Sequence, residues 1–177
     1  NIIPCILDGG MTGIGLESTV LDVTLDIPVI LRPGGVTKEM LEAVIGPVVE
    51  PSLEQQKIDS TPKAPGMKYT HYAPDAPVYL IEANKKAIET AIAELKPVHK
   101  VALLAPQNFE EIEADYYFSF GSAHDLEQMS ASLYDALRSC DKTDATIILA
   151  TATSKTGVGT AIMNRLEKAA GGKWYSL

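Results

Sequence analysis

Residues 63–74 have the sequence KAPGMKYTHYAP, and this stretch divides the chain into two parts of different character. Its two prolines, Pro65 and Pro74, disfavour a regular helix or a central strand, so we expect the backbone to run largely extended. Its lysines, histidine and tyrosines are side chains that contact phosphate groups and planar bases, whereas an ordinary linker consists of Gly, Ser, Pro and charged residues. We therefore predict that residues 51–76 form an extended linker that covers a ligand as a lid.

The part after the linker, residues 77–177, alternates between short apolar runs and amphipathic stretches. The apolar runs predict strands, and the stretches with a 3.6-residue period predict helices. Strands that alternate with helices indicate a small Rossmann-like α/β domain, in which helices cover a parallel sheet. The expected strands are 78–81, 101–104, 116–120 and 146–150, and the expected helices are 84–96, 109–113, 125–140 and 160–170.

The part before the linker, residues 1–50, predicts only a partial α/β domain. We expect a buried strand at 2–8, a strand with alternating, β-branched residues at 18–24 and a short strand at 29–31, followed by a short helix that Thr37 caps and that ends at Gly46. Three strands and one short helix cannot enclose a core on their own. Because the chain also begins with Asn on an apolar run, we expect it to be a fragment of a longer protein.

Composition narrows the class of protein. The net charge is −8 and there is no basic stripe, so tight binding to nucleic acid is not expected. No apolar run reaches the ~18–20 residues of a membrane span. The two cysteines, Cys5 and Cys140, lie far apart in apolar company without a zinc-binding spacing, which indicates buried thiols in a cytoplasmic protein.

One glycine motif resembles a nucleotide-binding loop but lacks its defining residues. Gly157 and Gly159 lie between a predicted strand and a predicted helix, where a dinucleotide fingerprint would begin. The third glycine of that fingerprint would fall at Ile162, and no Gly-Lys-Ser/Thr follows. We interpret this segment as an ordinary strand-to-helix turn, and His99 and His124, next to element ends, as surface or capping residues.

Ser18 and Arg32 are the two candidate ligand contacts in the first part. Ser18 follows a glycine-rich loop, 13–17, that would leave room for a ligand, although a plain hairpin loop explains it equally well. Arg32 ends a buried strand, where its guanidinium would bind phosphate or carboxylate. Its alternative is a structural ion pair with Glu17 or Asp22, and the residues alone leave both readings open.

Several segments taken together resemble the long form of L-threonylcarbamoyladenylate synthase. That family joins a YrdC-like domain to a smaller C-terminal α/β domain through a linker of this kind. The resemblance implies that residues 1–50 are the C-terminal part of the YrdC-like catalytic domain, 51–76 the linker and active-site lid, and 77–177 the small C-terminal α/β domain. The segments are ILDGG (6–10), GLESTV (15–20), ILRPG (30–34), APGMKYTHYAP (64–74), LYDALR (133–138) and GTAIMNRL (159–166).

The resemblance also implies an activity and a set of contacts. The family is a nucleotidyltransferase that converts L-threonine, bicarbonate and ATP into threonylcarbamoyl-AMP and pyrophosphate, and other proteins pass the threonylcarbamoyl group to an adenosine of tRNA. By its motifs, Ser18 would contact threonine and Arg32 the nucleotide. The linker would add nucleotide contacts from Lys68, Tyr69, His71 and Tyr72, whereas Thr70 stands where an arginine is common.

The resemblance leaves the chemistry incomplete in this chain. The family's upstream Lys, Arg and Ser-Ala-Asn segment, which grip the nucleotide, have no counterpart after Asn1. We therefore expect the 177-residue chain to be inactive alone. ATP enters as a substrate with Mg²⁺, for which no protein ligand is identified, and no nucleophilic Cys or Ser paired with a base is evident. The alternative is a non-catalytic nucleotide-sensing or regulatory module; a dinucleotide-binding protein is the weakest reading.

Overall fold

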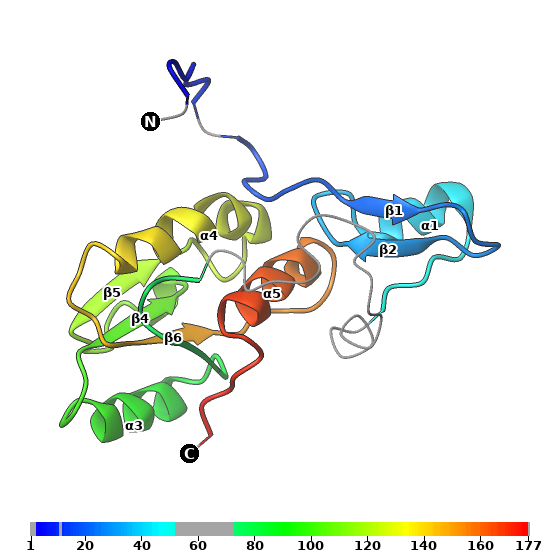
Figure 1. The fold of residues 1–177 in the computed structure, drawn as a ribbon. Coiled ribbons are helices and arrows are strands. Elements are labelled where there is room, and N and C mark those ends of the chain that lie inside the picture. The colour runs from blue at the N-terminus through cyan, green and yellow to red at the C-terminus, as the bar shows by residue number, and fades with distance from the viewer. Residues whose placement is uncertain (1–2, 11, 52–72, 177) are drawn as a thin grey trace.

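The computed structural model describes residues 3–10, 12–51 and 73–176, which form two sheets and the helices around them. The larger sheet has four strands and the smaller has two. Both sheets and their helices are drawn in Figure 1. In chain order the elements are β1 (Val20–Asp22), β2 (Val29–Arg32), α1 (Lys38–Ile45), β3 (Val78–Ile81), α3 (Lys85–Leu95), β4 (Val101–Ala105), the 3₁₀ helix η1 (Gln107–Phe109), β5 (Tyr116–Ser119), α4 (Leu126–Cys140), β6 (Ile147–Thr151) and α5 (Val158–Ala169).

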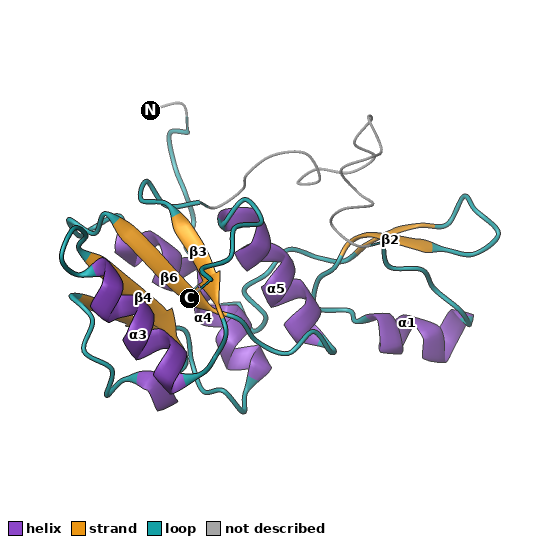
Figure 2. Cartoon of the chain, turned by 90° about the horizontal axis from the view of Figure 1, so that it is seen from below, coloured by secondary structure: helices purple, strands orange, loops and turns teal. Residues whose placement is uncertain are grey.

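The larger sheet is parallel throughout, as the alternation of strands and helices predicted. Its strand order is β3-β6-β4-β5, so β6, the last of these strands along the chain, lies between β3 and β4. Helix α3 lies on one face of this sheet, and α4 and α5 lie on the other (Figures 1 and 2). Parallel sheets are covered on both faces because their crossover connections place helices there.

The core therefore has two apolar layers, one on each face of the sheet. Alternate residues of each strand enter opposite layers, because successive side chains of a strand point to opposite faces. In β4, Leu103 packs with α3 and Leu104 packs with α4 and α5, and both are fully buried. Strand β6 is buried along its whole length. These continuous apolar strands are the signature that made this part of the chain predictable.

The C-terminal segment covers the edge of the sheet at β3. The amide of Leu80 donates to the carbonyl of Lys173 at 3.0 Å, and the amide of Tyr175 donates to the carbonyl of Leu80 at 2.8 Å. Trp174 forms a parallel bridge with Leu80. An edge strand with free backbone groups invites pairing with other chains, and this segment occupies those groups.

The helix starts predicted from sequence are confirmed by their caps. The side chains of Thr37, Asn84 and Asp125 each accept a hydrogen bond from the amide three residues later, at the starts of α1, α3 and α4. The helix expected at 109–113 is wrong: a single 3₁₀ turn ends at Phe109 instead. Phe109 and Ile112 nevertheless enter the α3-side core, so the apolar pattern reflected burial rather than a continued helix.

The smaller sheet consists of the antiparallel pair β1 and β2, with α1 beside it. In this part the apolar side chains of Ile30 and Val48 are buried, but α1 contributes no buried residue. Many other apolar side chains of the same part are exposed: Val23, Leu25, Ile27, Val36, Met40, Val44, Ile45 and Val49. The structure thus agrees with the expectation that these strands and this helix do not close a core.

Two expectations for the first residues are wrong. Residues 3–8 form no strand, and Ile6 and Leu7 are 79% and 93% exposed. A strand gains stability from a paired neighbour, and within the described residues none lies beside this segment. Cys5 is accordingly exposed, whereas Cys140 is buried as expected, and burial raises the pKa of its thiol to about 12. Within the described ranges, no helix combines the length and apolar character that crossing a membrane requires.

Replacing Leu103 by Ala tests how much the core of the parallel sheet contributes to the free energy of unfolding. Leu103 is fully buried in the central strand β4, so the substitution should lower the free energy of unfolding by about 2–5 kcal/mol. Val98→Ala is the matched control, because Val98 is 77% exposed and its truncation should change stability by less than about 0.5 kcal/mol. Urea denaturation measures both, and equal effects would contradict this description of the core.

Candidate functional site

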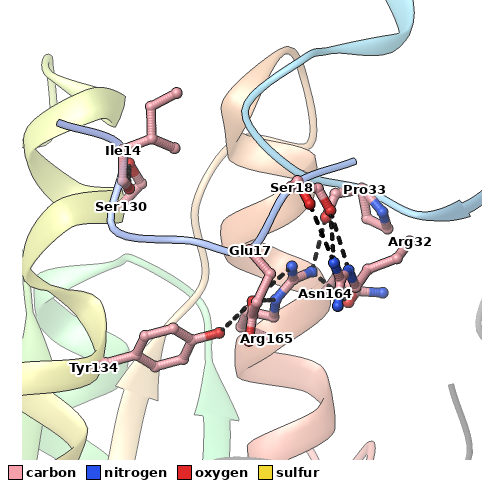
Figure 3. Close-up of polar contacts among 9 residues, drawn as sticks. All are labelled: Ile14, Glu17, Ser18, Arg32, Pro33, Ser130, Tyr134, Asn164 and Arg165. Atoms are coloured by element: carbon pink, nitrogen blue, oxygen red, sulfur yellow. Dashed lines mark hydrogen bonds and ion pairs between the residues drawn. The ribbon is translucent and has the colours of Figure 1, made fainter. Parts of the chain in front are cut away.

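The structure brings together the two ligand contacts predicted in the first part, Ser18 and Arg32. Antiparallel pairing sets Val20 of β1 opposite Arg32 at the end of β2. The Arg32 guanidinium donates from Nε and Nη2 to the carbonyl oxygen of Ser18 at 3.1 and 3.0 Å, and Nη2 lies 3.4 Å from Ser18 Oγ (Figure 3). Ser18 is exposed and Arg32 half-buried, so both side chains can still meet a ligand.

The loops that carry these residues touch through their backbones. A Cβ atom on Gly34 would lie 2.4 Å from both the Glu17 carbonyl oxygen and the Thr19 amide nitrogen, so only glycine permits this approach. The Thr19 hydroxyl also donates to the carbonyl of Val36 at 2.6 Å. A shift of the loop before β1 must therefore move the loop after β2.

Arg165 of α5 holds both loops from the side of the larger sheet. Its Nε donates to Glu17 Oε2 at 2.9 Å, and its Nη2 lies 2.9 Å from the same oxygen. Its Nη1 donates to the carbonyl of Pro33 and to Asn164 Oδ1, both at 2.9 Å. Arg165 is 2% exposed, and Figure 3 shows it between the two loops. The ion pair recorded for Glu17 is thus with Arg165 and not with Arg32, which answers one alternative left open by the sequence.

Helix α4 fixes the same segment at its other end. The Ser130 hydroxyl donates to the carbonyl of Ile14 at 2.6 Å, and the Tyr134 hydroxyl donates to Glu17 Oε2 at 2.9 Å (Figure 3). Gly15 has a φ of +66°, and a Cβ there would lie 2.5 Å from the Cα of Ala131. Gly15, in the loop before Ser18, therefore allows the backbone of this loop to pack directly against α4.

The charges and hydrogen bonds of this cluster favour the ionised form of Glu17. Burial acts to raise the pKa of Glu17, but hydrogen bonds from its own backbone and from Tyr134, together with Arg165, hold that pKa below its ordinary value. Burial, aided by the Glu17 carboxylate, raises the pKa of Tyr134. Lys168 lies three residues after Arg165 on α5, and burial together with the charges of Arg165 and Arg32 lowers its pKa to about 8. Cations so close together stabilise negative charge next to them.

Other sequence-predicted contacts fall elsewhere. Lys68, Tyr69, His71 and Tyr72 lie outside the described residues. Within the described ranges no group of three or more His, Cys, Asp or Glu side chains could hold a metal ion.

The glycine motif of α5 is a tight turn, as we interpreted it. Gly157 has a φ of +55°, and a Cβ on Gly159 would lie 2.1 Å from the Ser154 carbonyl oxygen. Both glycines are thus explained by the turn itself. His99 Nδ1 lies 3.1 Å from Thr146 Oγ1 near the start of β6, which fits a surface role.

Arg165 and Tyr134 were not predicted as functional residues. The available signal was a polar pair, Asn164 and Arg165, between the apolar residues Met163 and Leu166. In the structure eight residues of α5 are buried, and these two are among them. A helix that is buried nearly all round must be covered on the side away from its sheet. In this chain the cover is the loop that contains Glu17.

The fold defines an α/β protein in which two helices of a parallel sheet hold an antiparallel strand pair with a Ser–Arg contact. A family model, "Threonylcarbamoyl-AMP synthase, C-terminal domain", matches residues 36–171. The chain belongs to the threonylcarbamoyl-AMP synthase family.

Curated relatives and a solved structure agree with this assignment. The chain is 50% identical to the threonylcarbamoyl-AMP synthase of Bacillus subtilis over 171 residues, which are 95% of this chain and 49% of that protein. It is 43% identical to the enzyme of Pyrococcus abyssi, over 96% of this chain and 50% of that protein. The crystal structure of P. abyssi Sua5 complexed with L-threonine matches with a TM-score of 0.88 and 41% identity, over 99% of this chain and 52% of that one. The chain spans about half the length of the curated relatives it matches.

Replacing Glu17 by Gln should remove part of the stability loss at acid pH. A carboxylate whose pKa is lower in the folded state stabilises the fold above its unfolded pKa, near 4.5, and loses that contribution as the pH falls through the folded value. The wild type should therefore lose stability between about pH 5 and 3 more steeply than the variant. Urea unfolding over this range measures both, with Glu89→Gln, on the exposed side of α3, as the control. Parallel pH profiles for wild type and Glu17→Gln would refute the assigned ion pair.

Proposed function

We propose that this chain is the C-terminal half of an L-threonylcarbamoyladenylate synthase, which converts L-threonine, bicarbonate and ATP into threonylcarbamoyl-AMP and pyrophosphate. In this proposal residues 1–50 belong to a YrdC-like catalytic domain, 51–76 form the linker and lid, and 77–177 form the small C-terminal domain. The relatives that support it carry the name of this activity. Other proteins would then transfer the threonylcarbamoyl group to an adenosine of tRNA in the cytoplasm.

The contact between Arg32 and Ser18 is the observation that carries the proposal. It places a hydroxyl and a guanidinium side by side at the exposed end of the strand pair. A hydroxyl can donate to and accept from the polar groups of an amino acid, and a guanidinium binds phosphate oxygens as a planar fork. We assign Ser18 to L-threonine and Arg32 to the nucleotide. The structural relative that covers 99% of this chain was solved with L-threonine.

The exposed apolar side chains of the strand pair and α1 support the same proposal. Val23, Val44 and their apolar neighbours would cost free energy if water covered them permanently. Relatives twice as long contain a further half that could cover this surface. The proposed catalytic domain would thus consist of residues 1–50 together with a second, upstream segment.

The proposed reaction requires two things of these residues: they must stabilise negative charge at the α-phosphate and exclude water from the carbamate. Attack of the threonylcarbamate oxygen on the α-phosphate builds negative charge there as pyrophosphate leaves, and a fixed guanidinium at Arg32 would stabilise that charge. The carbamate hydrolyses readily, so a lid over the site would protect it. Lys68, Tyr69, His71 and Tyr72 of the linker are proposed as nucleotide contacts in that lid. Mg²⁺ would arrive bound to the phosphates of ATP, and we assign no residue of this chain to it.

Threonine-dependent pyrophosphate release tests the proposal. The 177-residue chain alone should release none, whereas a protein in which these residues follow the upstream half should release pyrophosphate only when L-threonine and bicarbonate are present. In that longer protein, Arg32→Ala should raise the KM for ATP about 10- to 100-fold, since a hydrogen bond to a charged group is worth roughly 1.5–3 kcal/mol. Ser18→Ala should raise mainly the KM for threonine.

The two substitutions also distinguish ligand contact from a purely structural role of Ser18 and Arg32. Equal losses for both substrates in both variants would mean that Ser18 and Arg32 stabilise the fold without contacting ligands. Absence of pyrophosphate release from the longer wild-type protein would instead favour the non-catalytic alternative, in which the chain senses a nucleotide. Equilibrium binding of labelled ATP to the same protein would then identify that module.

A further inference from the structure

The small domain carries a residue whose contacts reach both proposed substrate contacts. Arg165 lies in α5, 148 residues after Glu17 and 132 residues after Pro33, and it is bonded to both. Glu17 immediately precedes Ser18, and Pro33 immediately follows Arg32. The guanidinium thus holds the direct chain neighbours of the residues assigned to threonine and to the nucleotide.

These contacts close a ring. Arg165 binds Glu17, whose neighbour Ser18 accepts from Arg32, whose neighbour Pro33 accepts from Arg165. Each link is a hydrogen bond of 2.9 to 3.1 Å or a peptide bond. A ring fixes the relative position of its members more firmly than a chain of separate contacts, because no member can move without breaking a link or moving the others.

The chemistry of Arg165 suits this task. A guanidinium presents its donors in a rigid planar fork, so one edge can bind a carboxylate while the other binds a carbonyl at a fixed angle. Arg165 is 2% exposed, and a buried charge is retained at a cost unless it is paired. Tyr134 holds the same Glu17 oxygen from α4 and so fixes the carboxylate from a second helix.

We propose that Arg165 is a positioning residue that sets the geometry of both substrate contacts from the small domain. This inference rests on the proposed function and assigns the small domain a part in it. Arg165 itself touches no substrate; it acts through the Glu17–Ser18 and Arg32–Pro33 peptides. Loss of the guanidinium releases both loops at once. Displacement of a binding group by about 1 Å is sufficient to cost on the order of a hundredfold in rate.

The test uses the longer protein, with these residues after the upstream half, and three variants at Arg165 and Glu17. Arg165→Met and Arg165→Lys should each lower kcat/KM for threonine and for ATP by about 10- to 100-fold. Methionine donates to neither partner, and the ammonium group of lysine cannot bind Glu17 and the Pro33 carbonyl as a fork. The double variant Glu17→Gln with Arg165→Met removes both charges. It should therefore unfold in urea closer to the wild-type midpoint than Arg165→Met does, yet keep raised KM values for both substrates. Arg138→Met, an exposed arginine on α4, is the control and should match the wild type.

The outcomes separate positioning from stability and from the proposed function. Raised KM values in the double variant, measured at a temperature where it is fully folded, support positioning. A double variant with wild-type KM and kcat would overturn it, even if Arg165→Met alone fails to fold. A wild type that releases no pyrophosphate would overturn the proposed function and this inference together. Wild-type activity with an unaffected double variant would overturn this inference alone.

Discussion

The placement of the strand pair depends on one ion pair, between the buried Arg165 of α5 and the partly exposed Glu17 of the loop before β1. The guanidinium is almost fully buried and also binds the Pro33 carbonyl, so it joins the parallel-sheet part of the chain to the loop before β1 and the loop after β2. Leaving a buried guanidinium without its carboxylate would lower the stability of the fold by several kcal/mol. The ion pair therefore favours the loop position in which Glu17 reaches Arg165. The strand pair, which closes no core among the described residues, takes its position from this contact together with those of Ser130 and Tyr134 on α4.

Two glycines make the ion pair sterically possible. At Gly15 and Gly34 a side chain would collide with backbone atoms of α4 and of the loop before β1. The close approach of backbones at these points brings Glu17 within reach of α5 and also aligns Ser18 with Arg32. Gly15, which the sequence offered as room for a ligand, therefore first creates room for the protein's own chain. Substrate contacts and domain contacts share one set of loops.

The sequence predicted local structure well and long-range contacts poorly, for physical reasons. Periodicity and the cap at Thr37 are local, so they marked the helices, and the continuous apolar runs marked the parallel strands. The expected strand at 2–8 failed because a strand requires a partner that local pattern does not reveal. Motifs led to Ser18 and Arg32 as predicted ligand contacts, which remain predictions, whereas Arg165 was not predicted because its partners lie more than 130 residues away. The contacts expected from the linker remain predictions.

A double-mutant cycle between Glu17 and Arg165 measures whether this ion pair joins the two parts of the chain. Unfolding free energies would be measured in urea for wild type, Glu17→Gln, Arg165→Met and the double variant at neutral pH. If the ion pair joins the two parts, the double variant should lose less stability than the sum of the single variants, with a coupling energy of about 1–3 kcal/mol. Additive losses, within about 0.5 kcal/mol, would show that the two side chains act independently and would contradict the account.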